Sequence, residues 1–282
     1  MKYGINLLLW TAELNDGLLP TFEWLRSIGY DGVELPLFNP GLNYGAWGRR
    51  LDEFGLERSA VTVRTAADNP ISPDSAVRAA GVEANKRVID CCVAAGASML
   101  GGPFYSAHGE FTGQGPTDDE WAWGVESMRI VAEHAGDAGV VLALEPLNRF
   151  ETYLLTTQAD AARFVAQVDH PACQVMFDTF HAHIEEKDSS AAIRVAGERI
   201  RQVHISENDR STPGAGSVRW DETFDTLHDI GYDGWMTVEA FGLAMPEVAS
   251  ATKIWRRMYD SEQQLAREAL AFMQKQVATR WV

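Results

Sequence analysis

The chain has 282 residues, 46% of them apolar, and a formal net charge of −16. This length suits one (β/α)₈ barrel, for which roughly 250 residues is typical. The acidic charge argues against a nucleic-acid binder, which needs a surface rich in Lys and Arg. No run of about 18 uncharged apolar residues occurs, so we expect no membrane span.

Cysteine usage indicates the cellular compartment. The chain contains Cys91, Cys92 and Cys173, an odd count in which two residues are adjacent. This pattern is not that of a disulfide framework and is typical of proteins in a reducing environment. We therefore expect a cytoplasmic protein.

One signal recurs along the chain: a helical pattern, then a glycine, then a short apolar strand. Glycine just past a helix end supplies a left-handed cap, and buried parallel strands are short apolar runs. The sequence GYDG at 29–32 recurs at 231–234 and marks the same kind of helix-to-strand connection. The strands that we expect lie near residues 3–9, 33–35, 59–61, 98–100, 140–144, 173–177, 200–204 and 235–238.

Helical patterns separate these strands. They cover residues 18–28, 47–54, 75–95, 118–138, 157–168, 190–196, 221–230 and, in one long helix, about 249–274. Strands that alternate with helices predict a parallel sheet, and eight repeats favour a closed (β/α)₈ TIM barrel, an α/β fold, as a single domain over residues 1–282. An open doubly wound sheet is the alternative, but no Gly-rich phosphate-binding motif follows the first strand. The longest predicted loop, 101–116, is typical of a binding loop over a barrel mouth.

Four polar side chains stand at the ends of the last four predicted strands. Glu145 ends VVLALE, Asp178 ends QVMFD, His204 ends IRQVH and Glu239 ends WMTVE. In a barrel all four point into one mouth, where active sites of this fold lie. Taken singly, each has a structural interpretation as a cap, an ion-pair partner, a core histidine or a loop residue. Three carboxylates this close repel one another unless a cation neutralises them, so the set predicts a metal site.

The chemistry of these side chains indicates the kind of metal. Three carboxylates and one imidazole suit a hard divalent ion, with Mn²⁺ as first choice and Co²⁺ or Mg²⁺ as alternatives. Four protein ligands leave about two positions of an octahedron open, which suits two neighbouring oxygens of a sugar.

Four stretches carry a resemblance to a known family. They are LEPLNRFE at 144–151, DTFH at 178–181, HISENDR at 204–210 and VEAF at 238–241. With these four stretches in this order, the chain resembles the ketose 3-epimerases. That family includes the D-tagatose, D-psicose (D-allulose) and L-ribulose 3-epimerases and belongs to the xylose isomerase-like TIM barrel superfamily. The resemblance is close from about residue 140 onward, whereas the N-terminal half resembles the family only in architecture.

The resemblance implies roles for the four strand-end residues. Glu145 and Glu239 would be both metal ligands and the two acid/base groups, one on each face of the substrate. Asp178 and His204 would complete the set of ligands. Inverting C3 of a ketose means removing a proton beside a carbonyl and returning it to the other face, which needs a carboxylate on each face and stabilisation of the enediolate between them.

The resemblance also implies three substrate contacts. Glu151, His181 and Arg210 would hydrogen-bond the carbonyl end of the sugar and its neighbouring hydroxyls. Each has a structural alternative: His181 could cap or pair with Asp178, Arg210 could pair with Asp209, and Glu151 could pair with Arg149. His108 lies in the long loop, and nothing in the sequence decides whether it reaches substrate.

The expected function is therefore a metal-dependent epimerase that inverts C3 of a free ketose through a cis-enediolate. An aldose–ketose isomerase, or an isomerase of the hydroxypyruvate or inosose type, is the alternative on the same metal site. A nuclease would need more histidines than seven and a basic groove, and a binding-only barrel would not need the Glu145–Glu239 pair. No Lys/Arg cluster marks a phosphate site, so the expected partner is a small-molecule sugar, with no nucleic acid and no membrane. The resemblance implies a homodimer or homotetramer.

Overall fold

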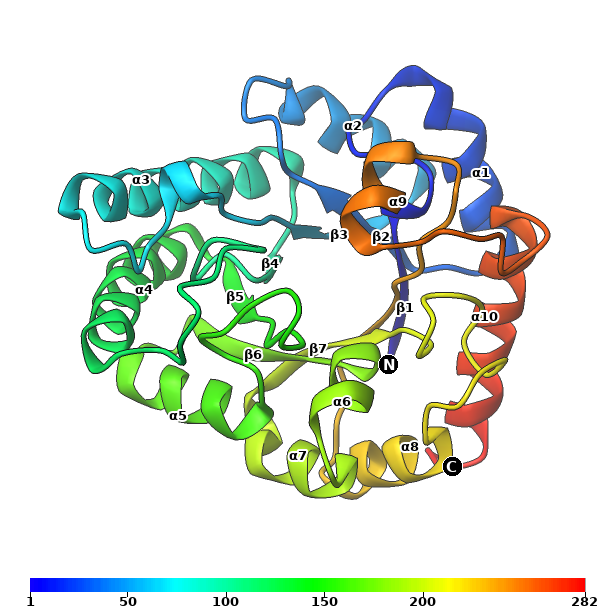
Figure 1. The fold of residues 1–282 in the computed structure, drawn as a ribbon. Coiled ribbons are helices and arrows are strands. Elements are labelled where there is room, and N and C mark those ends of the chain that lie inside the picture. Colours follow the sequence, from blue (N-terminus) through cyan, green and yellow to red (C-terminus); the bar gives the residue numbers. More distant parts are fainter. Residues whose placement is uncertain (282) are drawn as a thin grey trace.

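Eight parallel strands close into a barrel in the computed structural model, which describes residues 1–281. Each strand pairs with the next along the chain, and the last pairs with the first. This confirms the predicted TIM barrel, and Figure 1 shows its strands inside a ring of helices. The strands are β1 (Lys2–Asn6), β2 (Gly32–Pro36), β3 (Glu57–Val61), β4 (Met99–Gly102), β5 (Val141–Leu144), β6 (Cys173–Asp178), β7 (Ile200–Ile205) and β8 (Trp235–Val238).

Helices follow the strands, as the glycine-punctuated pattern predicts. Two of them, 75–95 and 118–138, have the predicted bounds, and most others differ by one to three residues. Among the described residues, no helix is both long and apolar enough to cross a membrane. The helices are α1 (Leu19–Ile28), α2 (Tyr44–Phe54), α3 (Ser75–Ala95), α4 (Asp118–Ala138), α5 (Gln158–Val168), α6 (Thr179–Glu185), α7 (Ser189–Ala196), α8 (Trp220–Asp229), α9 (Pro246–Thr252) and α10 (Glu262–Ala278).

Helix α6 is an element that the sequence pattern did not indicate. It begins directly after β6, with no loop between them. The Asp178 side chain accepts hydrogen bonds from the backbone N–H groups of Phe180 and His181 and so caps the first turn. An N-cap carboxylate of this kind satisfies backbone donors that have no partner within the helix.

The predicted long helix over about 249–274 is wrong, because the chain forms two helices there, α9 and α10. The chain leaves α9 at Lys253, which has a left-handed backbone (φ 62°). Ile254 then turns inward and is buried with Phe241 and Ala249. Burial of this side chain outweighs the helical propensity of the segment. In Figure 1, α9 (orange) is separate from α10 (red) and lies nearer the barrel axis.

The barrel interior is filled in tiers. Met99, Ala143, Met176 and Trp235 form an apolar cluster inside the barrel. Side chains two residues apart on a strand share a face, so the residues two positions after Ala143 and Met176 lie one tier nearer the mouth. Those residues carry the polar groups of the next section. Gly101 belongs to the crowded lower tier, where a Cβ atom would lie 2.3 Å from the Met176 methyl carbon.

Candidate metal centre

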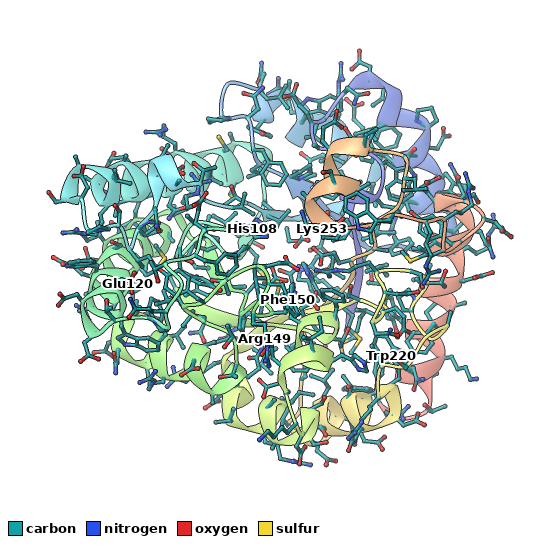
Figure 2. The ribbon with its side chains drawn as sticks, in the orientation of Figure 1. His108, Glu120, Arg149, Phe150, Trp220 and Lys253 are labelled. Atoms are coloured by element: carbon teal, nitrogen blue, oxygen red, sulfur yellow. The ribbon has the colours of Figure 1, made fainter. Side chains whose placement is uncertain are left out.

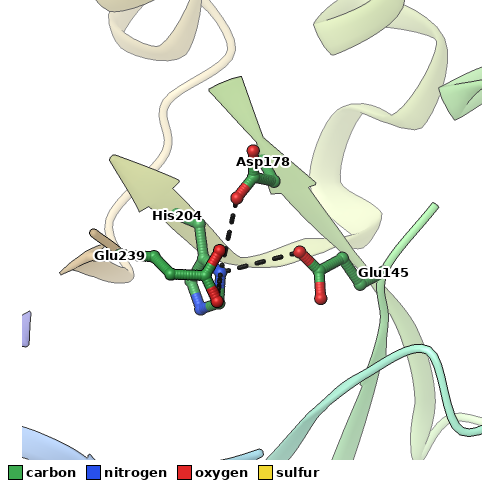
Figure 3. A group of neighbouring side chains, drawn as sticks. All are labelled: Glu145, Asp178, His204 and Glu239. Carbon is green, nitrogen blue, oxygen red and sulfur yellow. Dashed lines mark ion pairs between the residues drawn. The ribbon is translucent and has the colours of Figure 1, made fainter. Parts of the chain in front are cut away.

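The four strand-end residues meet at the carboxyl end of the barrel. Glu145 directly follows β5, Asp178 is the last residue of β6, His204 is the penultimate residue of β7 and Glu239 directly follows β8. All four side chains are buried, and one potential ligand atom of each lies within 4.8 Å of the others. The predicted convergence is therefore present, and Figure 3 shows the carboxylates gathered around the imidazole.

The geometry of the cluster fits a bound cation. His204 Nδ1 lies 3.7 Å from Glu145 Oε1, 3.5 Å from Asp178 Oδ2 and 3.5 Å from Glu239 Oε1. Among the described residues, neither His204 Nδ1 nor Glu145 Oε1 has a hydrogen-bond partner. A buried polar atom without a partner is costly, and here two such atoms face each other among carboxylates. Three carboxylate oxygens and one imidazole nitrogen are a donor set for a divalent ion.

The electrostatics of the cluster lead to the same interpretation. Burial raises the pKa of Glu145 above its ordinary range, and the charges of Glu239 and Asp178 add to the effect. Burial alone would also raise the pKa of Asp178, but the Arg210 guanidinium holds that pKa well below its usual range. One carboxyl of the cluster therefore tends to keep a proton in the absence of a cation, because like charges in a buried site disfavour full ionisation.

Arg210 reaches this cluster from the loop after β7. Its Nη1 donates to Glu239 Oε2 at 2.5 Å, to Ser206 Oγ at 2.8 Å and to Asp178 Oδ2 at 3.3 Å. Its backbone is left-handed, with φ of 63°, a conformation that is uncommon outside glycine. The structural alternative, a surface pair with Asp209, is excluded because the Arg210 side chain is buried and faces the cluster.

His181 and Glu151 lie on the other side of the cluster and are linked through Asn148. The Asn148 backbone N–H donates to His181 Nδ1 at 2.9 Å, and its side-chain amide donates to Glu151 Oε1 at 2.7 Å. His181 Nε2 lies 3.6 Å from Glu145 Oε1 and 3.1 Å from Arg210 Nη2, so an N–H donor faces each ring nitrogen. Arg149, the suspected ion-pair partner of Glu151, binds Glu185 instead.

His108 also belongs to this region, which the sequence left undecided. Its Nε2 lies 3.2 Å from Glu151 Oε2, and the backbone N–H of Gly109 donates to the Glu151 carbonyl at 2.8 Å. Figure 2 shows His108 near Phe150 and Lys253, and these three residues line an outer cavity of about 600 Å³.

An inner cavity of about 200 Å³ leads from there to the cluster. Its polar wall consists of side chains from the segments after β4–β8, including the start of α6: His108, Glu145, Glu151, His181, Arg210 and Glu239. Its other wall is mostly apolar and comes from the end of β3, from the segments after β1–β4 and from α9: Leu8, Phe38, Val61, Val63, Pro103, Val248 and Ala251. The cavity thus brings together all three predicted substrate contacts and two of the predicted ligands.

Sequence reasoning missed one buried charged residue beside the cluster. Glu34 lies in β2, is 0% exposed and has Oε2 3.0 Å from His204 Nε2. A signal for it was present, because a glutamate between Val33 and Leu35 in an apolar strand is costly to bury without partners. The N-terminal half showed no motif that would have assigned it a role.

Comparison with known proteins adds an independent line of evidence. The model of the xylose isomerase-like TIM barrel family matches residues 22–276. A ketose 3-epimerase of Arthrobacter globiformis is 33% identical over 281 residues, covering 97% of this chain and 96% of the relative. A D-psicose 3-epimerase of Ruminiclostridium cellulolyticum is also 33% identical, over 96% of this chain and 95% of the relative. The crystal structure of a D-allulose 3-epimerase from Methylomonas sp., in complex with D-allulose, superposes with a TM-score of 0.93 at 30% identity, covering 98% of this chain and 97% of that one.

Proposed function

Because the chain belongs to the ketose 3-epimerases of the xylose isomerase-like TIM barrel family, which are carbohydrate epimerases of the isomerase class, we propose that it inverts C3 of a free ketose. The substrates that we propose are of the D-tagatose, D-fructose, D-psicose or L-ribulose type. The observation that carries this proposal is the pair of buried glutamates, Glu145 and Glu239, which face one cavity beside the same imidazole nitrogen.

The proposed ligands of the metal are Glu145, Asp178, His204 and Glu239. When bound, a divalent ion, with Mn²⁺ as first choice and Co²⁺ or Mg²⁺ as alternatives, supplies Lewis-acid stabilisation of negative charge that develops on the sugar oxygens. This assignment is supported by the atoms that lack hydrogen-bond partners, His204 Nδ1 and Glu145 Oε1, and by the excess of carboxylates around them.

The proton transfers fall to the two glutamates. One carboxylate removes the proton from C3, which leaves a cis-enediolate across C2 and C3, and the other carboxyl returns a proton to the opposite face of C3. The net reaction changes neither the oxidation state nor the position of the carbonyl. Which glutamate acts as base depends on the face that carries the C3 hydrogen in the bound sugar.

The substrate contacts that we propose are Glu151, His181 and Arg210. Arg210 presents a guanidinium held by two carboxylates and donates to sugar oxygens, and His181 presents its Nε2 beside Glu145 and Arg210. Glu151 accepts from hydroxyl groups. Arg210 is the one Lys or Arg side chain among the described residues that line the inner cavity, and it is already paired, which favours an uncharged sugar over a phosphorylated one.

The test uses chelated protein to which Mn²⁺ or Co²⁺ is returned. It is incubated in D₂O with D-fructose, D-psicose, D-tagatose and L-ribulose, and the products are analysed for C3 epimers and for deuterium. We expect metal-dependent epimerisation with deuterium at C3, lost in Glu239→Gln and kept in Glu247→Gln, a control on the exposed side of α9. An aldose product with deuterium at C2, together with recovered ketose that carries deuterium at C1, would instead support the isomerase alternative.

Two expectations from the sequence stay predictions: the cytoplasmic location and the homodimeric or homotetrameric state. Light scattering coupled to size-exclusion chromatography measures the second. A mass of one chain, 31.1 kDa, would contradict it.

A further inference from the structure

A polar tier of side chains from β1, β2, β3 and β7 lies inside the barrel on the Nε2 side of His204. Its centre is Glu34, whose carboxylate accepts four hydrogen bonds. Asn6 Nδ2 donates to Oε2 at 2.7 Å and Gln202 Nε2 donates to Oε1 at 2.5 Å, while Ser59 Oγ is a longer partner at 3.3 Å. The fourth donor is His204 Nε2, 3.0 Å from Oε2. All five residues are buried.

The contact with Glu34 decides which nitrogen of His204 carries a proton. An ionised carboxylate only accepts hydrogen bonds, so the nitrogen that faces it, Nε2, carries the hydrogen. In the neutral imidazole the lone pair is then on Nδ1. Nδ1 is the nitrogen that faces Glu145, Asp178 and Glu239, and it has no hydrogen-bond partner among the described residues.

We infer that Glu34 is a positioning residue that holds His204 in the Nε2–H tautomer and, through its fixed negative charge, strengthens metal binding at Nδ1. This inference rests on the proposed metal site but not on the substrate or the reaction. Glu34 itself is not a ligand, because the imidazole ring lies between its carboxylate and the other three. Carboxylates behind metal-binding histidines commonly change metal affinity by about 10–100-fold.

The side chain of Gln202 makes a conservative substitution of Glu34 possible. Glu34→Gln keeps the size of the side chain and one acceptor oxygen for Asn6 and His204 but places an NH₂ group opposite the Gln202 amide. Gln202 Oε1 has no hydrogen-bond partner among the described residues, so a flip of the Gln202 amide gives the new NH₂ group an acceptor. The variant therefore removes the charge while the hydrogen bond to His204 Nε2 is kept.

The first test measures Mn²⁺ binding in the absence of sugar, from the electron paramagnetic resonance signal of free Mn²⁺ during titration. We expect Glu34→Gln to bind Mn²⁺ about 10–100-fold more weakly than the wild type. Its thermal unfolding without metal should be no earlier than that of the wild type, because a buried charge has been removed. Ser59→Ala loses another hydrogen bond of Glu34 but not the one to His204, and it should bind Mn²⁺ like the wild type.

The second test observes the tautomer itself. In ¹H–¹⁵N spectra of the Mg²⁺-loaded protein, we expect His204 to be protonated on Nε2 in the wild type and in Glu34→Gln. Glu34→Met, which offers no acceptor, should bind Mn²⁺ more weakly than Glu34→Gln.

The inference is overturned if Nδ1 carries the proton, if Glu34→Gln binds Mn²⁺ as tightly as the wild type, or if Ser59→Ala is weakened equally. A wild type that binds Mn²⁺ but epimerises no ketose would contradict the proposed function alone.

Discussion

The His108–Glu151 pair joins the long loop after β4 to the loop after β5. Burial alone would raise the pKa of Glu151, but the hydrogen bond from His108, the nearby His181 and Arg210, and the Asn148 amide together lower it to about 2. A carboxyl whose pKa is depressed in the folded state stabilises that state above its unfolded pKa of about 4.3, and this stability is lost as the pH falls through the folded value.

We therefore predict a change in acid stability for His108→Phe, which keeps a ring but removes the hydrogen bond. The pKa of Glu151 should rise, so its contribution to stability should be lost at higher pH than in the wild type. Urea unfolding at several pH values between about 5 and 2 measures this difference, with His183→Phe, an exposed histidine, as control. Identical pH dependence in wild type and His108→Phe would contradict the prediction.

Arg210 bonds two of the carboxylates through one nitrogen and lies against His181 through another. A lysine cannot reproduce this fork of donors, so Arg210→Lys should leave part of the buried charge unpaired. Breaking a buried charge pair costs about 3–5 kcal/mol. We expect kcat/KM for the preferred ketose to fall by at least about 10²-fold, and steady-state kinetics at saturating metal test this. A loss below tenfold would show that the fork geometry is unimportant.

At the scale of single residues, the sequence predicted the polar residues at the carboxyl ends of apolar strands and missed Glu34 in the middle of one. Glu145 and Asp178 are visible because a carboxylate follows a run of apolar side chains. Glu34 lies within a run of apolar residues. Its role depends on its contact with His204, which is 170 positions away in the sequence. The link between His108 and Glu151 likewise depends on a loop conformation that no local pattern encodes.

Helix α9 covers part of the inner cavity with Val248, Ala251 and Thr252. It has seven residues, which is too short to be stable by itself, and it is held where its own Ala249 and the following Ile254 are buried with Phe241. Its attachment is therefore local, and weakening it should open the mouth without unfolding the barrel.

We predict that Ile254→Ala loosens α9 selectively. Removing this side chain typically costs about 2–5 kcal/mol in a core, but here the cost falls on the helix that it anchors. Amide hydrogen exchange over 246–254 should become faster, and KM for the ketose should rise more than kcat falls. Val93→Ala, at an exposed position of α3, is the matched control and should change neither. Faster exchange throughout the barrel would instead indicate a global defect.

Elements were predictable where a glycine or a capping residue ends them and unpredictable where tertiary contacts do. Helix α4 begins after a capping box formed by Thr117 and Glu120 and ends at Ala138, where Gly139 supplies the left-handed cap that the glycine pattern predicts. The segment between α9 and α10, which begins at Lys253, contains no glycine or proline. The break there depends on where Ile254 can be buried, which is a property of the folded barrel.

The proposed ligands come from four consecutive strands, so a bound ion would tie half of the barrel wall together. A ligand that binds only the folded state stabilises it by RT ln(1 + [L]/Kd), about 2.7 kcal/mol at a concentration of 100 Kd. We predict that Mn²⁺ raises the thermal unfolding temperature of the whole protein and that a chelator reverses this. Asp178→Asn keeps the helix cap but loses a charged ligand, so its shift should be much smaller. An equal shift in this variant, measured by calorimetry, would count against the site.

The two walls of the inner cavity come largely from different halves of the chain. The proposed ligands and the proposed acid/base pair come from the ends of β5–β8, whereas most of the apolar wall comes from β3 and the segments after β1–β4. Mutations in the first half can therefore reshape the space around a sugar while the chemistry is inherited unchanged. Asn6 and Glu34 are exceptions, because Asn6 contacts Glu239 at the end of the neighbouring strand and Glu34 reaches across the barrel to His204. If N-terminal halves were exchanged between relatives, the incoming half would have to contain Asn and Glu at these two positions.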